Sequence, residues 1–311
     1  MVGKYATETL RADNGGIERA AQILRGGGLV AVPTETVYGL AARADDDEAV
    51  ARIYAAKGRP SFNPLIVHVA SLSAAERLAV FSEAARALAR QYWPGPLTLV
   101  LSRQRGAGLA AAVTAGLDTV ALRMPSHPAM RDLLEFTGLP LAAPSANRSG
   151  FVSPTSAAHV LGALDGRIDA VIDGGPSEAG IESTIVAVGE DGSRRVLRPG
   201  PILLEDIARP DAGGRIEAPG QLASHYSPGK PVRLDATEVA PDDFVIGFGA
   251  MEGDCTLSEA GDLAEAAARL YACFHQGAIS DKPRIAVAPI PEEGIGIAIN
   301  DRLRRAATPP D

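Results

Sequence analysis

The feature of this sequence that most limits its possible folds is the alternation of short apolar runs with amphipathic stretches. Strand-like runs occur at residues 29–32, 65–70, 97–102, 119–124, 170–175 and 183–188, and helix-like stretches at 15–25, 45–56, 73–93, 127–136 and 153–164. Strands that alternate with helices are typical of an α/β domain. The alternation is irregular, and its connections are long and rich in Gly and Pro. We therefore predict a mixed, twisted sheet with flanking helices.

This pattern is lost at residues 208–230 and returns in a shorter form beyond them. We interpret 208–230 as an interdomain linker, because it has no sustained periodicity. After it, strand-like runs at 244–250 and 284–290 alternate with helix-like stretches at 263–274 and 295–307. This order predicts a small C-terminal α/β domain with a parallel sheet. The predicted domains are therefore 1–207 and 231–311, on either side of the linker.

Charge and composition exclude several classes of protein. The net charge is −8, from 30 Lys and Arg against 38 Asp and Glu, whereas a dedicated nucleic-acid binder would be basic; a local basic cleft stays open. No stretch has the length and apolar character of a membrane span, and the first residues lack the core of a signal peptide. We expect a cytoplasmic protein without a membrane partner.

Cysteine and histidine spacing gives no sign of a metal centre. Cys255 and Cys273 are the only cysteines and form no CxxC pair, so neither a structural zinc site nor a disulfide framework is expected. The five histidines lack the spacing of metal ligands. We expect His127, His159 and His275 to be surface or capping residues.

Motifs of several enzyme classes are missing from the sequence. There is no GxSxG nucleophile elbow and no GxxxxGK[ST] P-loop. GIGIAI at 294–299 lacks the third glycine of a dinucleotide-binding fingerprint, so we interpret it as the start of a helix.

Lys57-Gly58-Arg59 lies between a helix-like stretch and a strand-like run and has two interpretations. Two cations around a glycine suit an anion such as a triphosphate. The same residues also suit an ordinary helix C-terminus, with a cation facing the helix dipole and glycine at the cap. The spacing alone favours the second interpretation, but it leaves the nearby Asn63 and His68 unexplained.

Two other segments place polar side chains beside apolar ones. In APSAN at 143–147, Ser145 and Asn147 can both offer hydrogen bonds to one ligand, or they can form an Asx or Ser turn. Arg123 lies near the end of the apolar run 119–124, where burial would require an anionic partner. That partner could be a ligand carboxylate or an internal Asp or Glu.

Three turns use more specialised residues than an ordinary connection needs. PTETVYGL at 33–40 follows directly on the apolar run LVAV, GIESTIVAV at 180–188 places Glu182, Ser183 and Thr184 at the mouth of a predicted strand, and RPGP at 198–201 holds Arg198 beside rigid turn residues. We interpret the first turn as one wall of a pocket for a small amino acid and a nucleotide.

These segments together resemble the YrdC-like family of L-threonylcarbamoyladenylate synthases, in the long form with a second C-terminal domain. The matching segments are PTETVYGL (33–40), KGRPSFNPLIVHV (57–69), WPGPLTLVL (93–101), GLDTVALRMPSHP (116–128), PLAAPSANRSGFVSPT (140–155), IDGG and GIESTIV (172–186), and LRPGP (197–201). They run in order over residues 14–205. The resemblance continues through PG and HYSP (219–228) and GIGIAINDRLRRAA (294–307).

The resemblance implies a fold and a reaction. The fold would be a YrdC-like twisted mixed sheet with flanking helices, followed by a small Rossmann-like α/β domain. The enzyme would be a nucleotidyltransferase that joins L-threonine, bicarbonate and ATP into threonylcarbamoyl-AMP and pyrophosphate. A tRNA threonylcarbamoyl transferase would then use the product beside the anticodon, and a weak contact with tRNA is compatible with this role. Mg²⁺ would bind with ATP, held mainly by the phosphates rather than by protein side chains.

The resemblance also implies roles for individual residues. The catalytic set that grips the triphosphate corresponds to Lys57, Arg59, Ser145 and Asn147. The residues that fall where the family holds threonine are Thr36, His68, Arg123, Ala143 and Ser183. The further ATP contacts correspond to Asn63, Thr119, Ser153, Arg198 and Tyr226. The tetrapeptide HYSP departs from the family pattern at Ser227, where relatives have alanine, and residues 231–311 are short for the long form.

Two other functions share this pattern of residues. A YrdC-like protein could recognise double-stranded RNA or ribosomal precursors without synthesis, although the acidic net charge disfavours this alternative. A relative that uses carbamoyl phosphate to carbamoylate another acceptor would carry acylphosphatase-like or zinc-finger segments, which this chain lacks.

Overall fold

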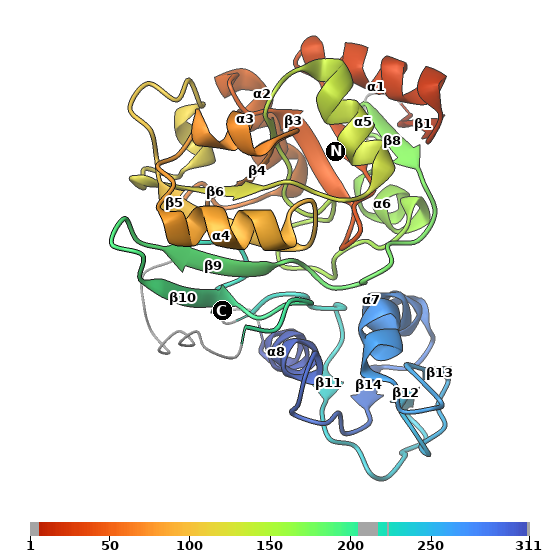
Figure 1. Cartoon of the computed structure of the whole chain (residues 1–311). Coiled ribbons are helices and arrows are strands. Elements are labelled where there is room, and N and C mark those ends of the chain that lie inside the picture. The colour runs from red at the N-terminus through yellow and green to blue at the C-terminus, as the bar shows by residue number, and fades with distance from the viewer. Residues whose placement is uncertain (1–5, 205–216, 223, 310–311) are drawn as a thin grey trace.

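The N-terminal part of the chain forms a ten-stranded sheet, and the C-terminal part forms a four-stranded sheet (Figure 1). The computed structural model describes residues 6–204, 217–222 and 224–309. The strands of the large sheet are β1 (Glu8–Arg11), β2 (Val30–Val32), β3 (Gly39–Arg43), β4 (Ile66–His68), β5 (Leu97–Ser102), β6 (Thr119–Arg123), β7 (Leu141–Ala142), β8 (Ala170–Asp173), β9 (Thr184–Val188) and β10 (Arg194–Arg198). Their order is β1-β8-β2-β3-β7-β4-β6-β5-β9-β10.

The large sheet is mixed, as the irregular alternation predicted. Parallel pairs include β1 with β8, β4 with β6 and β5 with β9, whereas β2 with β3 and β5 with β6 are antiparallel. The helices of this domain are α1 (Asn14–Arg25), α2 (Asp47–Lys57), α3 (Leu72–Glu76), α4 (Glu83–Tyr92), η1 (Ala111–Val113), α5 (Pro128–Thr137) and α6 (Ala157–Leu164). The predicted helical region 73–93 is divided into α3 and α4.

Helices cover both faces of the sheet near β2. Side chains alternate between the two faces of a strand, so Val30 and Val32 pack with α1 and α5, whereas Leu29 and Ala31 pack in the core formed with α2, α4 and α6. Helix α1 buries a stripe that includes Ile17 and begins where the Asp13 side chain accepts a hydrogen bond from the Gly16 amide. Double coverage explains why LVAV is apolar throughout.

The opposite half of the sheet leaves one face for a site. Here Ile66, Val100, Ala121, Ile185 and Leu197 pack in a small cluster together with Ala218, which comes from the chain segment that follows the large sheet. Polar residues of β4, β5, β6 and the start of β9 continue this surface into the pocket described below. On this face, the polar ends of the strands are therefore covered by the chain segment that includes Ala218 and not by a helix of the N-terminal domain.

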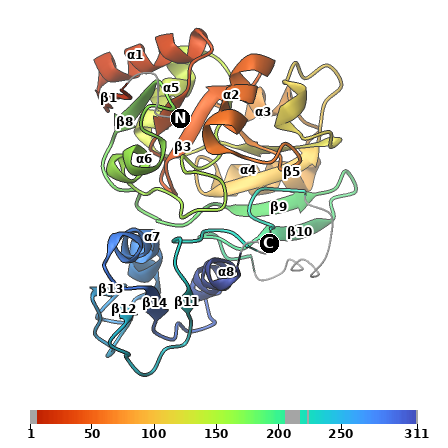
Figure 2. The same cartoon turned by 180° about the vertical axis from the view of Figure 1, so that it is seen from behind.

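The C-terminal domain is a parallel sheet with two helices, in agreement with the prediction. Its elements are β11 (Val232–Arg233), β12 (Asp243–Gly247), β13 (Cys255–Thr256), α7 (Leu263–Ile279), β14 (Arg284–Val287) and α8 (Gly296–Ala307), and the strand order is β11-β14-β12-β13. All three strand pairings are parallel. Figures 1 and 2 show α7 and α8 between this small sheet and the larger domain.

The expectation that the cysteines would not form a disulfide was wrong. Cys255 in β13 and Cys273 in α7 are bonded, with their Cα atoms 5.8 Å apart. Their separation of 18 residues matches no short motif, and the pairing arises only because the chain turns back from β13 into α7. His127, as expected, caps α5 by accepting a hydrogen bond from the Ala129 amide.

The predicted domain boundaries stay a prediction. Residues 208–216 of the expected linker lie outside the described residues, and 217–222 and 224–230 contain no helix or strand. Among the described helices, none has the length and apolar character needed to cross a membrane.

Because Phe274 is packed in the core of the C-terminal domain, its truncation should lower the free energy of unfolding substantially. This side chain is fully buried in the cluster between α7, α8 and the small sheet. Phe274→Ala should cost about 3–5 kcal/mol, because it removes buried apolar surface and leaves a cavity. Thermal unfolding followed by circular dichroism measures the change, and Gln276→Ala, at an exposed position of the same helix, is the matched control. Equal midpoints for the two variants would contradict this packing.

Candidate functional site

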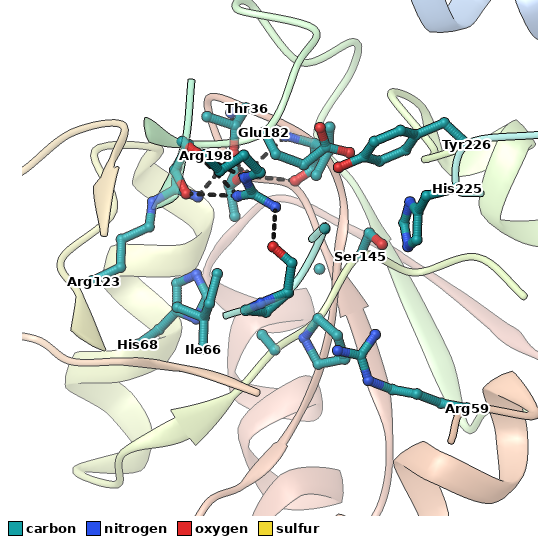
Figure 3. Close-up of a pocket in the computed structure, with 18 residues that line it drawn as sticks. Thr36, Arg59, Ile66, His68, Arg123, Ser145, Glu182, Arg198, His225 and Tyr226 are labelled. Carbon is teal, nitrogen blue, oxygen red and sulfur yellow. Dashed lines mark hydrogen bonds between the residues drawn. The ribbon is translucent and has the colours of Figure 1, made fainter. Parts of the chain in front are cut away.

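A cavity of about 50 Å³ lies between the large sheet and the segment that contains Tyr226 (Figure 3). Figure 3 shows the labelled side chains pointing into one space from several elements. Nine of the residues predicted for the site line it: Thr36, Arg59, His68, Arg123, Ala143, Ser145, Ser183, Arg198 and Tyr226. The cavity therefore joins most of the threonine and nucleotide residues implied by the resemblance.

The two threonines and the tyrosine of PTETVYGL make hydrogen bonds that hold this turn in place. Thr34 Oγ1 accepts hydrogen bonds from the amides of Thr36 and Val37 and so holds the turn. Thr36 is fully buried, and its Oγ1 accepts a hydrogen bond of 2.9 Å from Arg123. Tyr38 donates its hydroxyl hydrogen to the Gly175 carbonyl 2.7 Å away. This turn is thus one wall of the cavity, as interpreted from the sequence.

Arg123 at the end of β6 has an internal acidic partner. Its Nη2 lies 2.7 Å from Glu35 Oε1, and both side chains are buried. Burial alone would raise the pKa of Glu35, but the charge of Arg123 and its hydrogen bond hold the pKa below its ordinary value. Arg123 lines the cavity, whereas Glu35 is not among the lining residues. The guanidinium is therefore the member of this ion pair that a ligand carboxylate can reach.

His68 lies beside Arg123, because the two residues are paired in the β4–β6 register. Burial, followed by the positive charge of Arg123, lowers the pKa of His68 to about 3. The imidazole is consequently neutral near neutral pH. Its buried Nδ1 has no hydrogen-bond partner in the described part of the chain, which leaves this atom free to contact a ligand.

Lys57 is the end of a helix, as the second interpretation from the sequence has it; its binding of a triphosphate stays a prediction. Helix α2 ends at Lys57, and Gly58 caps it in the left-handed conformation with φ of 61°. The Lys57 ammonium, however, donates to the carbonyl oxygens of Ser145 at 2.6 Å and Asn147 at 2.5 Å. Burial, and then the charge of Arg59, lower its pKa well below the ordinary value. Lys57 therefore holds the loop after β7 and lies behind the cavity rather than lining it.

Ser145 and Asn147 form a turn, and one of them faces the site. Ser145 Oγ donates to Asn147 Oδ1 at 2.5 Å, and Asn147 Nδ2 donates to the carbonyl oxygens of Arg148 and Phe151. Ser145 lines the cavity, whereas Asn147 lies behind it with Lys57.

Arg59 lines the cavity from the loop that follows α2. Its Nε and Nη2 donate to the carbonyl oxygens of Asn63 and Pro64. Burial lowers the pKa of Arg59 to about 10, so the guanidinium stays charged at neutral pH. Asn63 does not line the cavity, but its buried Oδ1 lacks a hydrogen-bond partner among the described residues.

Arg198 forms hydrogen bonds with Ser183, the residue that precedes β9. Its Nε and Nη2 both donate to the Ser183 carbonyl, at 3.1 and 3.0 Å, and Nη2 also donates to Ser183 Oγ. Ser183 Oγ in turn lies 2.8 Å from Thr98 Oγ1. Glycine is required in the RPGP turn because a Cβ at Gly200 would lie 2.4 Å from the Thr184 amide nitrogen.

Thr119 is not among the residues that line the cavity. It begins β6, paired with Ser102, whereas Arg123 ends the same strand. Four residues of strand span roughly 13 Å. Ser153 also lies outside the lining, but it donates a hydrogen bond of 2.6 Å to Glu182, which does line the cavity.

Several residues of the site could not be assigned from the sequence. Glu35 and Thr98 act through partners that are distant in the chain, and Glu182 was noted only as a polar residue at a strand mouth. His225 lines the cavity beside Tyr226, and burial lowers its pKa to about 3. Its position next to the predicted Tyr226 was the only available signal.

Tyr226 covers the cavity in an uncommon backbone conformation. Its φ is 64°, which is unusual for a residue other than glycine. The ring is almost completely buried, and burial raises the pKa of its hydroxyl to about 12. That hydroxyl lacks a hydrogen-bond partner in the described ranges. Non-glycine residues with positive φ persist where surrounding contacts fix them, often at ligand sites.

The electrostatics of the cavity favour a polyanion. Glu35 and Glu182 each pair with an arginine, whereas Lys57, Arg59 and Arg198 form no salt bridge within the described ranges and donate to backbone oxygens. Positive charges without carboxylate partners suit phosphate groups. No cluster of three or more His, Cys, Asp or Glu side chains suited to a metal lies within residues 6–204, 217–222 and 224–309.

Comparison with known proteins covers nearly the whole chain. Residues 22–200 match the family described as "Telomere recombination" (Sua5, YciO and YrdC), and residues 182–308 match the "Threonylcarbamoyl-AMP synthase, C-terminal domain" family. The threonylcarbamoyl-AMP synthases of Bacillus subtilis and Pyrococcus abyssi are each 39% identical; the alignments cover 97% and 94% of this chain, and 95% and 94% of the relatives.

A solved structure shows the same arrangement of both domains. The crystal structure of P. abyssi Sua5 complexed with L-threonine has a TM-score of 0.89 and 37% identity, with 97% of this chain and 98% of that chain covered. The sequence predicts a C-terminal domain that is short for the long form, but the match covers nearly all of the P. abyssi chain. The chain belongs to the Sua5/YrdC family, in the two-domain form whose members are named threonylcarbamoyl-AMP synthases.

Proposed function

We propose that this protein joins L-threonine, bicarbonate and ATP into threonylcarbamoyl-AMP and releases pyrophosphate. The observation that supports this proposal most strongly is that Arg59, Arg123 and Arg198 line one cavity together with short hydroxyl side chains. Its relatives along the whole chain carry the name of this activity, and one was crystallised with L-threonine. The product would serve a tRNA threonylcarbamoyl transferase.

The proposed threonine site is the part of the cavity around Arg123. The guanidinium would hold the threonine carboxylate while remaining paired with Glu35, since Arg123 lines the cavity and Glu35 does not. Neutral His68 and the hydroxyls of Thr36 and Ser183 would contact the polar groups of the amino acid. Ala143 contributes only a methyl group to the lining and leaves room for the ligand.

The proposed nucleotide site is the part around Arg59 and Arg198, with Lys57 behind it. In the adenylation step, a carbamate oxygen attacks the α-phosphorus, the bond to the bridging oxygen breaks, and pyrophosphate leaves with that electron pair. Fixed cations stabilise the negative charge that develops on the phosphates. An arriving triphosphate would also favour the charged form of Lys57, whose pKa burial depresses.

Mg²⁺ is proposed to bind with ATP rather than to the protein alone. The two carboxylates of the site, Glu35 and Glu182, are both engaged by arginines, so phosphate oxygens would supply most ligands. The ion would neutralise part of the phosphate charge.

Binding of the substrates requires the segment with Tyr226 to move. The cavity of about 50 Å³ is far smaller than the roughly 300–1,000 Å³ typical of small-molecule sites. We propose that this segment opens to admit ATP and closes again before the adenylate forms. Closure would exclude water from the carbamate, which decomposes readily.

The burial of the cations disfavours the alternative of an RNA-binding protein. Lys57, Arg59 and Arg198 are 3%, 9% and 4% exposed, so they present little charge to a duplex surface. A carbamoyl-phosphate-using relative is disfavoured by the match of residues 182–308 to the synthase C-terminal domain. A weak tRNA contact elsewhere stays compatible with the proposed activity.

The proposed activity predicts pyrophosphate release that depends on threonine. Purified protein should convert labelled ATP to threonylcarbamoyl-AMP and pyrophosphate only when L-threonine, bicarbonate and Mg²⁺ are all present. Chromatography of the labelled nucleotide measures the product, and omission of each substrate is the control. Absence of threonine-dependent pyrophosphate, together with tight binding of double-stranded RNA, would favour the alternative.

Replacement of Lys57 should abolish most turnover and leave the fold intact. Lys57→Ala removes a buried cation of the proposed triphosphate site, and we expect kcat to fall by about 100-fold or more. The thermal unfolding midpoint should fall, because the carbonyl oxygens of Ser145 and Asn147 lose their buried donor, but the folded state should persist. Lys282→Ala, at a lysine that donates to the Pro241 carbonyl and does not line the cavity, is the control. Near-normal activity of Lys57→Ala would remove this residue from the triphosphate site.

Replacement of Arg123 should affect threonine far more than ATP. Loss of a charge-assisted hydrogen bond predicts a threonine KM raised by about 10- to 100-fold, with a small change in the ATP KM. Because Arg123→Ala leaves Glu35 buried without its cation, the measurement is repeated in Glu35→Gln/Arg123→Ala. Equal increases in both KM values, in both variants, would exclude the carboxylate role.

A further inference from the structure

Helices α7 and α8 of the C-terminal domain each contribute a side chain that contacts Glu182. Glu182 lines the cavity. Its carboxylate accepts hydrogen bonds of 2.9 Å from the Tyr271 hydroxyl of α7 and 3.1 Å from Arg302 Nε of α8. Tyr271 and Arg302 are both fully buried. The second domain therefore reaches the site through two specific polar contacts.

Arg302 also contacts the RPGP turn and the tyrosine that covers the cavity. Its Nη1 donates a hydrogen bond of 2.6 Å to the Pro199 carbonyl in the RPGP turn. The guanidinium carbon lies 5.7 Å from the centre of the Tyr226 ring, within the range of a cation–π contact. A single side chain of α8 thus contacts the acidic wall, the turn after Arg198 and the covering tyrosine.

The charge of Glu182 makes these contacts important for an anionic ligand. Burial alone would raise the pKa of Glu182, but Arg302 and then Arg198 lower it to about 2, so the carboxylate is ionised. An ionised carboxylate in the wall would repel phosphate groups unless a cation compensated it. Arg302 compensates it from the side of the C-terminal domain.

Because Arg302 pairs with Glu182, Arg198 stays available to bind a ligand. Its hydrogen bonds run to the Ser183 carbonyl and hydroxyl and to the Pro219 carbonyl, and it forms no salt bridge with the Glu182 carboxylate. Without Arg302, Arg198 is the cation that still acts on Glu182. Pairing with Glu182 would then withdraw Arg198 from a ligand.

We propose that Arg302, supported by Tyr271, is a positioning residue through which the C-terminal domain completes the nucleotide site. It holds Glu182 in an ion pair, keeps Arg198 free for the polyphosphate, and seats Tyr226 over the cavity. The inference rests on the proposed function, since it assigns the ligand of Arg198 as a nucleoside triphosphate.

Steady-state kinetics of the full-length protein test this assignment. Arg302→Met should raise the ATP KM by about 10-fold or more and change the threonine KM by less than about 2-fold. Arg304→Met, at an exposed arginine of the same helix, is the control and should resemble the wild type. An ATP KM of Arg302→Met equal to that of Arg304→Met would overturn the proposal.

A second substitution separates positioning from mere packing. Glu182→Gln/Arg302→Met should recover most of the loss, to within about 3-fold of the wild-type ATP KM, because a neutral glutamine side chain at this position still accepts hydrogen bonds but cannot capture Arg198. A double variant no better than Arg302→Met would overturn the role assigned to the Glu182 charge.

Milder variants keep the test valid where Arg302→Met does not fold. Arg302→Lys retains the charge, and Tyr271→Phe removes only the hydroxyl that donates to Glu182. Both should raise the ATP KM by about 2- to 5-fold with unfolding midpoints near that of the wild type. An unchanged ATP KM in both would overturn the proposal.

A binding measurement distinguishes failure of the inference from failure of the proposed function. If the wild type makes no threonine-dependent pyrophosphate, the proposed function fails, and titration calorimetry with the non-hydrolysable analogue AMPCPP decides the inference. Weaker binding by Tyr271→Phe and Arg302→Lys than by the wild type would support it. Equal dissociation constants, or no binding by the wild type, would overturn it.

Discussion

The site depends on how the protein neutralises charges that it buries together. Isolated ions are costly to remove from water, so buried carboxylates need a cation and hydrogen bonds. Glu35 and Glu182 receive theirs from Arg123 and Arg302. Lys57, Arg59 and Arg198 instead donate to backbone oxygens. This unequal pairing leaves net positive charge at the cavity and determines which ligands it suits.

The fold positions these charges by ending strands and turns at one place. The register of β4 and β6 sets His68 beside Arg123, and the turn after β2 brings Glu35 and Thr36 against the same guanidinium. Most of this architecture could be predicted: periodicity indicated the mixed sheet and the parallel C-terminal sheet. The disulfide was predicted wrongly, because its partners come together through the path from β13 to α7 and share no local motif.

Site residues that belong to a short sequence motif could be predicted, whereas partners that are distant in the chain could not. Turn chemistry marked Thr36, Ser145 and Arg198, which all line the cavity. Pairing partners such as Glu35 with Arg123, or Glu182 with Arg302, are separated by 88 and 120 residues (123 minus 35; 302 minus 182), and a single sequence carries no sign of such contacts. The sequence therefore could not decide whether the partner of Arg123 is a ligand or an internal acid. The structure shows an internal acid, Glu35, and places Arg123 but not Glu35 in the lining of the cavity.

The central claim is that one cavity holds an amino acid next to the phosphates of a nucleotide. A crystal structure with L-threonine and AMPCPP measures this most directly. The account predicts the threonine carboxylate within hydrogen-bond distance of Arg123, and the phosphates in contact with Arg59 and Arg198 beneath Tyr226. Ligands bound at separate surfaces, or phosphates placed away from these arginines, would contradict it.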